Sequence, residues 1–274
     1  MTLHPGAAPV DADTAVAAGG YPVQADRVPD ERIASGRYVV SFARSAAELD
    51  EVLRLRYRVF NLELGEGLEA SHVTGRDEDG LDARFHHLLI RESDSGACVG
   101  TYRMQTAEMA GLLGGFYTSC IFALSGLPAE VLSRSVEIGR ACVDRSHRNG
   151  RVLHLLWRGL AAYLSWNRKR YLFGCCSLTT QDQALGLATH KELAARGHLH
   201  ETFRVAPLPH AVCGGPKGAT LPPPHIPALF QSYLNLGAKA CGPPAIDREF
   251  QTIDFLVLLD VDRLGPRVLR SFFR

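Results

Sequence analysis

No uninterrupted apolar run in this chain is longer than five residues, and Phe255–Leu259 has that length. A membrane-spanning helix needs about 20 apolar residues, so the sequence predicts none. Strand-length apolar runs are mixed with helical patterns and do not alternate with them strictly. This favours an α+β fold with a central mixed, largely antiparallel sheet flanked by helices. With 274 residues, 46% of them hydrophobic, the chain can bury a core of that kind.

The overall charge argues against two classes of protein. Thirty basic side chains nearly balance 29 acidic ones, which gives a formal net charge of +1. A nucleic-acid binder is often basic throughout, and an acidic disordered chain would carry a large negative charge. We therefore expect no nucleic-acid partner.

The charge is unevenly distributed along the chain. Residues 63–82 carry seven acids and one base, whereas residues 144–170 carry seven bases and one acid. The acidic segment lies in a predicted loop over 61–84, long enough to be a lid or a binding loop for a cationic molecule. The basic segment is a candidate docking face for an acidic protein. Each run is also consistent with a solvated surface.

The cysteines and histidines do not follow the spacing of a metal site. The seven cysteines include no C-x-x-C motif, and the odd count argues against a disulfide framework. Cys175–Cys176 and His198–His200 lack structural-zinc spacing. His86–His87 opens an apolar run, where core histidines are the simpler interpretation. We expect no metal site and a reducing, cytoplasmic environment.

The first residues have the composition of a leader. Residues 1–36 are rich in Ala, Gly, Pro and Asp, and they lack the basic start and apolar core of a signal peptide. We expect a disordered leader over 1–36, followed by a single domain over 37–274.

One arginine interrupts the apolar face of a predicted helix. The capping box Ser45–Glu48 starts this helix, and Arg56 falls within its apolar stripe. A buried guanidinium needs a carboxylate or carbonyl partner. Arg56 is therefore either part of a structural ion pair or an arginine that binds substrate.

Two predicted strands, 98–106 and 136–144, carry polar residues that a core does not need. The two-residue period places Glu137 on the face opposite Arg140. Glycines interrupt both strands, which is understandable if a ligand or another backbone approaches there. The basic turn that follows, residues 145–151, leads into a predicted helix, and backbone amides at such a start can bind an anion.

These segments occur in a recognisable order. They are Leu55–Phe60, Asp79–Asp82, Phe85–Ile90, Val99–Arg103 and Glu137–Arg140, and further on Leu156–Trp157, Tyr171–Cys175, Leu221–Pro223, Tyr233–Ala238 and Ile253–Leu259. Together, over roughly residues 38–266, they resemble the GNAT-like acyltransferases of the ornithine lipid synthase type. Those proteins are often labelled hemolysin-like and are distant relatives of acyl-homoserine lactone synthases.

The resemblance implies a GNAT-like fold and an N-acyltransferase activity. Such enzymes move a fatty acyl group, usually 3-hydroxylated, from acyl carrier protein to the α-amine of L-ornithine and form lyso-ornithine lipid. By position, the residues that match those held important in the lactone-synthase relatives are Arg56, Phe60, Asp79, Asp82, Arg103, Glu137 and Arg140. We take Glu137 as the catalytic candidate and the other six as substrate-binding candidates. Residues 148–150 only partly match the usual GNAT pyrophosphate loop, which favours a carrier-protein thioester over CoA. We expect no bound cofactor.

The chemistry of amide formation suggests a role for each group. Glu137 would take the proton of the amine, unless it merely pairs with Arg103 or Arg56. Asp79 and Asp82 would hold the substrate ammonium, and Arg103 or Arg56 its carboxylate. Amides exposed where the two Gly-containing strands separate would stabilise the oxyanion, and no covalent intermediate is required.

The remaining expectations concern the partners. The acyl carrier or its pantetheine arm would contact Arg145, Arg148, Asn149, Gly150 and Arg151, and the fatty chain would contact Phe60, Phe116 and Phe122. Product release would involve peripheral contact with the inner face of the membrane. The alternative functions are acyl-homoserine lactone synthesis from S-adenosylmethionine, a membrane-active hemolysin-like protein, and a plain acetyl-CoA enzyme.

Overall fold

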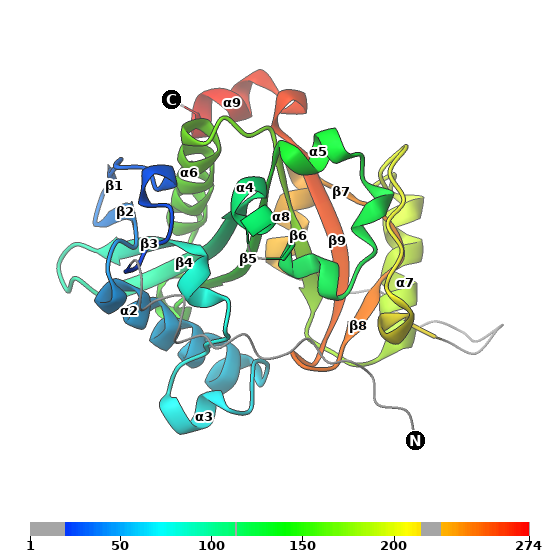
Figure 1. Cartoon of the computed structure of the whole chain (residues 1–274), viewed down its shortest axis with the longest axis horizontal. Coiled ribbons are helices and arrows are strands. Elements are labelled where there is room, and N and C mark those ends of the chain that lie inside the picture. Colours follow the sequence, from blue (N-terminus) through cyan, green and yellow to red (C-terminus); the bar gives the residue numbers. More distant parts are fainter. Residues whose placement is uncertain (1–19, 113, 215–225, 274) are drawn as a thin grey trace.

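The computed structural model describes residues 20–112, 114–214 and 226–273. Its strands are β1 (Ile33–Ser35), β2 (Tyr38–Phe42), β3 (His86–Glu92), β4 (Cys98–Thr106), β5 (Ser135–Val143), β6 (Tyr171–Leu178), β7 (Lys239–Ala240), β8 (Ala245–Asp247) and β9 (Thr252–Asp260). They form one sheet in the order β1-β2-β3-β4-β5-β6-β9-β7, with β8 paired to β9 (Figure 1). All pairs are antiparallel except β5 with β6. The predicted α+β class, with a mixed and largely antiparallel sheet, is confirmed.

Helices flank this sheet. They are α2 (Ala46–Arg56), α3 (Ser71–Thr74), α4 (Ala107–Leu112), α5 (Ala129–Ser133), α6 (Gly150–Trp166), α7 (Gln183–Ala195), α8 (Ala228–Asn235) and α9 (Pro266–Phe272). A π-helical segment over Tyr57–Leu64 continues α2. In Figure 1, α9 packs beside α6, while α7 lies at the other end of the sheet. In the described part of the chain, no helix is long and apolar enough to cross a membrane.

Local sequence accounts for the helix starts. Ser45 caps α2 by accepting the amide of Glu48 at 3.3 Å, as the capping box predicts. Asp182 caps α7 by accepting the amide of Ala184 at 2.9 Å. These side-chain oxygens satisfy amides that a helix start leaves without an intrahelical partner.

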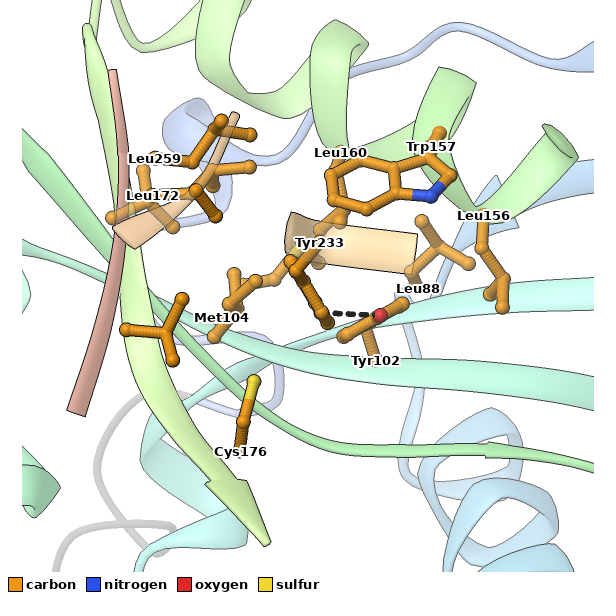
Figure 2. Close-up of a cluster of buried hydrophobic side chains, with 14 of the residues drawn as sticks. Leu88, Tyr102, Met104, Leu156, Trp157, Leu160, Leu172, Cys176, Tyr233 and Leu259 are labelled. Carbon is orange, nitrogen blue, oxygen red and sulfur yellow. Dashed lines mark hydrogen bonds between the residues drawn. The ribbon is translucent and has the colours of Figure 1, made fainter. Parts of the chain in front are cut away.

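The two faces of the sheet have different cores, which we call the α6 face and the α2 face. On the α6 face, Leu156, Trp157 and Leu160 of α6 lie over Leu88 and Tyr102 of the sheet (Figure 2). On the α2 face, the helix α2 packs over β3, β4 and β5. The chain segments around residues 116–132 and 203–211 cover the half built from β6, β8 and β9. The sheet is therefore buried on both sides around its middle strands.

The leader prediction is wrong for residues 20–36. Strand β1 pairs with β2, and Val28 and Ile33 are buried in the core. The carbonyl of Val28 accepts a hydrogen bond from Arg44 at 2.9 Å. Apolar side chains that pack on the sheet thus order a segment whose composition suggested disorder. Residues 1–19 and the Leu221–Pro223 segment lie outside the described residues.

Candidate active site

A pocket of about 270 Å³ lies where β5 and β6 diverge. The two strands pair over only three residues, and the last pair is Glu137 with Phe173. At the next position, a Cβ on Gly174 would lie 2.1 Å from the carbonyl oxygen of Ile138. Beyond this close contact β6 continues alongside β9, so the separation opens a gap through the sheet.

The pocket has a polar half and an apolar half. Because partners in register share a face of the sheet, the registers place one group of lining residues on the α2 face: Arg103, Glu137, Cys175, Ser177, Asp247 and Asp254. The α6 face supplies another group: Tyr102, Ile138, Leu172, Phe230, Tyr233 and Leu259. The gap therefore joins a charged space to an apolar one.

Glu137 is fully enclosed and makes no ion pair with Arg103 or Arg56. Its Oε1 accepts the amide of Thr118 at 2.6 Å and the Thr118 hydroxyl, and its Oε2 accepts the amide of Tyr117 at 2.9 Å. A carboxylate offers about four lone-pair sites, so three are occupied and one remains on Oε2. Burial raises the pKa of Glu137, and the Thr118 and Tyr117 hydrogen bonds oppose that rise.

Arg56 belongs to a buried ionic cluster behind the pocket wall. It is 0% exposed and donates to Asp77 at 2.9 Å and to both oxygens of Asp82, at 2.5 and 3.2 Å. Arg103 donates to Asp79 at 2.6 Å and to Asp82 at 3.0 Å. Despite the cost of burial, the two guanidinium groups hold the pKa of Asp82 well below its usual range.

This cluster differs from the roles predicted for its members. Arg56, Asp79 and Asp82 do not line the pocket, and their charges are already paired, so they do not offer the expected substrate-binding groups. The ion-pair alternative for Arg56 is the one that the structure displays. Arg103 does line the pocket, but its Nη1 is committed to Asp79 and Asp82.

Arg140 lines the same pocket as Glu137, although strand alternation predicted opposite faces. Residues Arg103 and Thr101 of β4 pair with Gly139 and Cys142 of β5, so β5 carries one extra residue. Arg140 sits in this bulge with a φ of 49°. The guanidinium of Arg140 stacks on Phe250 at 3.7 Å and lies 3.4 Å from the carboxylate of Asp77, while its Nη2 has no hydrogen-bond partner.

The predicted origin of the oxyanion donors is also corrected. The two glycine-containing strands, β4 and β5, stay paired through the site. The strands that separate are β5 and β6, because Gly174 brings them into contact once and β6 then follows β9. Beyond Glu137, no strand of the described chain pairs with the edge of β5 that faces β6.

The basic turn, which we define as Arg145, Arg148 and Arg151, lies outside the pocket lining. The side-chain oxygen of Asn149 caps α6 and accepts the amides of Arg151 and Val152 at 3.1 and 3.0 Å. Those amides are therefore occupied and form no vacant pyrophosphate site. Arg148 donates two hydrogen bonds to Glu63, at 2.6 and 2.8 Å.

The apolar lining differs in part from the prediction. Phe60 lines the pocket, but Phe116 and Phe122 do not, because they pack in the core over β6 and β9. Instead, Tyr102 and Tyr233 form the buried wall, and their hydroxyls share a hydrogen bond of 2.5 Å (Figure 2).

Sequence reasoning missed two acidic residues of the site, Asp247 and Asp254. Asp254 interrupts an otherwise apolar strand, and a charged residue in a buried strand is a signal that could have identified it. Asp247 has no comparable signal, since it ends the three-residue strand β8, which is too short to show an apolar pattern. In the described part of the chain, no cluster of three His, Cys, Asp or Glu side chains has the arrangement of a metal site.

Known proteins resemble this chain over most of its length. Residues 55–158 match the Acetyltransferase (GNAT) domain. An L-ornithine N(alpha)-acyltransferase of Rhizobium meliloti (strain 1021) is 33% identical over 253 residues, which cover 84% of this chain and 82% of the relative. One of Agrobacterium fabrum (strain C58) is 33% identical over 254 residues, 86% of this chain and 85% of the relative. The solved structure of the AHL synthase LasI covers 87% of this chain and 96% of its own, with 14% identity and a TM-score of 0.46.

Proposed function

Because this chain belongs to the L-ornithine N(alpha)-acyltransferase family of GNAT acyltransferases, we propose that it transfers a fatty acyl group from acyl carrier protein to the α-amine of L-ornithine. The product would be lyso-ornithine lipid. One observation carries this proposal, namely that a gap between β5 and β6 connects an apolar cavity to a buried carboxylate. An acyl chain and a polar amine can therefore meet at one point.

The apolar half of the pocket suits the fatty chain. Leu172, Phe230 and Leu259 line it and are buried among the side chains of α6 and α8. Burial of each methylene group contributes about 0.8 kcal/mol. The thioester carbonyl would then lie in the gap, beside the unpaired edge of β5, whose amides would stabilise the oxyanion.

Glu137 is the proposed general base. Its one unoccupied lone-pair site on Oε2 would accept the proton of the α-ammonium, directly or through water. The neutral amine attacks the thioester carbonyl, the tetrahedral intermediate collapses, and the carrier thiol leaves with a proton. The raised pKa of Glu137 suits a base that must both take and release a proton.

Arg140 is the proposed partner of the substrate carboxylate. Among the arginines considered, Arg140 is the better candidate, because Arg103 is paired with two carboxylates and Arg56 is outside the pocket. Arg140 has an Nη2 without a hydrogen bond, and its stacking on Phe250 fixes the plane of the guanidinium.

The acyl donor is tested together with the reaction. The purified protein is mixed with L-ornithine and either 3-hydroxyacyl carrier protein, the unhydroxylated acyl carrier protein, long-chain acyl-CoA or acetyl-CoA, and thiol release is followed. We expect release of holo-carrier protein and an N-acylornithine in the mass spectrum. A failure to release thiol with every donor would contradict the proposed function, and a preference for CoA would contradict the proposed donor.

A further inference from the structure

Two buried carboxylates in the polar half of the pocket have no cationic partner among the described residues. Asp247 is 7% exposed and Asp254 is 4% exposed, and both line the pocket. The acids of the neighbouring cluster are different, since Asp77, Asp79 and Asp82 all pair with arginines. An unpaired buried charge is costly, so a pair of them in a cavity indicates a missing cation.

The hydrogen bonds of these two residues come from neutral groups. The Oδ1 of Asp247 accepts the amides of Glu249 and Phe250 at 2.9 and 3.0 Å, and its Oδ2 has no hydrogen bond to a described residue. The Oδ1 of Asp254 accepts the Thr252 hydroxyl at 2.9 Å. Burial, and then the charge of Asp247, raise the pKa of Asp254 to about 6. Ser177 and Cys175 also hydrogen-bond to Asp254, so all of these partners are neutral groups.

The strand register places both carboxylates on the α2 face, on the same side as Glu137. Asp247 pairs with Thr252 and Asp254 pairs with Ala245, so the two acids are diagonal neighbours about 7–8 Å apart. Along β6, Phe173 lies beside Glu137 and Ser177 lies beside Asp254, a separation of about 13 Å between backbones.

Glu137, Asp247 and Asp254 all line the pocket across that interval. Cys175 lies midway between Phe173 and Ser177 on β6, and after burial the charges of Asp254, Glu137 and Asp247 raise its pKa. The base and the two unpaired acids therefore border the same stretch of the pocket.

We propose that Asp247 and Asp254 bind the side-chain ammonium of the amino-acid acceptor. This inference rests on the proposed function. Carboxylates that hold an ammonium keep it protonated, and a protonated amine cannot attack a thioester. The pair would thus select a dibasic substrate and direct acylation to the α-amine beside Glu137. Asp247 and Asp254 would thus bind the substrate ammonium, the role that the sequence suggested for Asp79 and Asp82.

The test compares L-ornithine with L-norvaline, which has the same carbon chain without the side-chain amine. With wild-type protein and saturating acyl donor, we expect kcat/KM to favour ornithine by at least about thirtyfold, since an unpaired buried charge is left by norvaline. In the Asp254→Asn and Asp247→Asn variants, the kcat/KM values for the two substrates should lie within a few fold of each other, mainly because the KM for ornithine rises. Acylation at the side-chain amine, detected by fragmentation mass spectrometry, should increase.

Controls separate this role from a structural one. Glu249→Gln removes an exposed acid from the same connection between β8 and β9 and should keep the preference of the wild type. Thermal melting shows whether each variant is folded, and calorimetry measures ornithine and norvaline binding without turnover. If folded Asp247→Asn and Asp254→Asn variants still discriminate like the wild type in binding and turnover, the inference is wrong. If the wild type binds ornithine selectively but releases no thiol, the proposed function fails and the ammonium site stands.

Discussion

At the level of single residues, the site contains two groups of ionisable side chains: those that form ion pairs with one another, and those that form none. Arg56, Asp77 and Asp82 satisfy one another in the interior. Glu137 lines the pocket, is enclosed by neutral donors and keeps one free lone-pair site on Oε2. We infer that the first group holds the site in place, and that Glu137 performs chemistry.

The role of Glu137 predicts a specific kinetic effect. Glu137→Gln should lower kcat by roughly 10²- to 10⁴-fold, the usual contribution of a general base. Because burial raises the pKa of Glu137, wild-type activity should fall as the pH drops through that raised value, when the base becomes protonated. The variant should lack this limb of the pH profile. Steady-state kinetics from pH 5 to 9 check both points, with circular dichroism as the folding control; a wild-type profile in the variant would contradict the assignment.

The role of Asp82 predicts an effect on stability. Asp82→Asn leaves Arg56 without its principal partner, and breaking a buried pair costs about 3–5 kcal/mol. The folded-state pKa of Asp82 is lowered, so its stabilisation is complete above the unfolded value of about 3.9 and is lost as the pH falls further. The difference between wild type and variant should therefore shrink below about pH 4. Urea unfolding at several pH values measures this difference, and an equal difference at every pH would contradict the linkage.

At the level of elements, two departures from regular strand geometry create the site. The bulge in β5 brings Arg140 to the pocket that Glu137 lines. The parting of β5 from β6 after one close contact opens the gap. Alternation along a strand predicts neither feature, because each depends on how many residues the partner strand supplies.

The close contact at Gly174 predicts that a single methyl group disturbs the site. In Gly174→Ala, the new Cβ would meet the Ile138 carbonyl oxygen at 2.1 Å, so β5 and β6 must move apart. We expect a loss of about 1–3 kcal/mol in the free energy of unfolding, and a fall in kcat larger than that loss of folded protein explains. Gly139→Ala is the matched stability control, because its Cβ would meet no atom within 4 Å. Chemical denaturation and kinetics compare the two variants; equal stability would contradict the steric argument.

At the level of the whole molecule, several charges of the acidic run (63–82) and the basic run (144–170) form ion pairs within the fold. Four of the seven acids of the acidic run form ion pairs: Asp77, Asp79 and Asp82 pair with buried arginines, and Glu63 pairs with Arg148. Six of the seven bases of the basic run lie near the two ends of α6, and Lys169 at the far end pairs with Glu108. Arg145 and Arg151 are exposed at the start of α6, and this is the end where we propose the contact with acyl carrier protein.

Docking of acyl carrier protein at that end predicts a salt-dependent effect. Arg145→Glu combined with Arg151→Glu should raise KM for acyl carrier protein by about tenfold at low ionic strength and by less at high ionic strength, because salt screens charges beyond about 10 Å at 0.1 M. The kcat value and the KM for ornithine should change little. Lys191→Glu combined with Arg196→Glu makes the same change of charge on α7, at the other end of the sheet (Figure 1). An equal effect of both pairs would argue against a defined docking surface.

The sequence by itself determined the fold class, the positions of the main strands and helices, and the family. Capping residues, periodicity and ordered motifs are local signals, and each acts within a few residues of the chain. It also identified Glu137, Arg103 and Arg140 as polar residues in buried strands. Only the tertiary structure decided which charges are paired, since the partners of Arg56 lie more than 20 residues away. The tertiary structure also decided which strands separate, and it brought Asp247 and Asp254 to the pocket that Glu137 lines. The physical reason is that burial and charge compensation depend on contacts between distant segments of the chain.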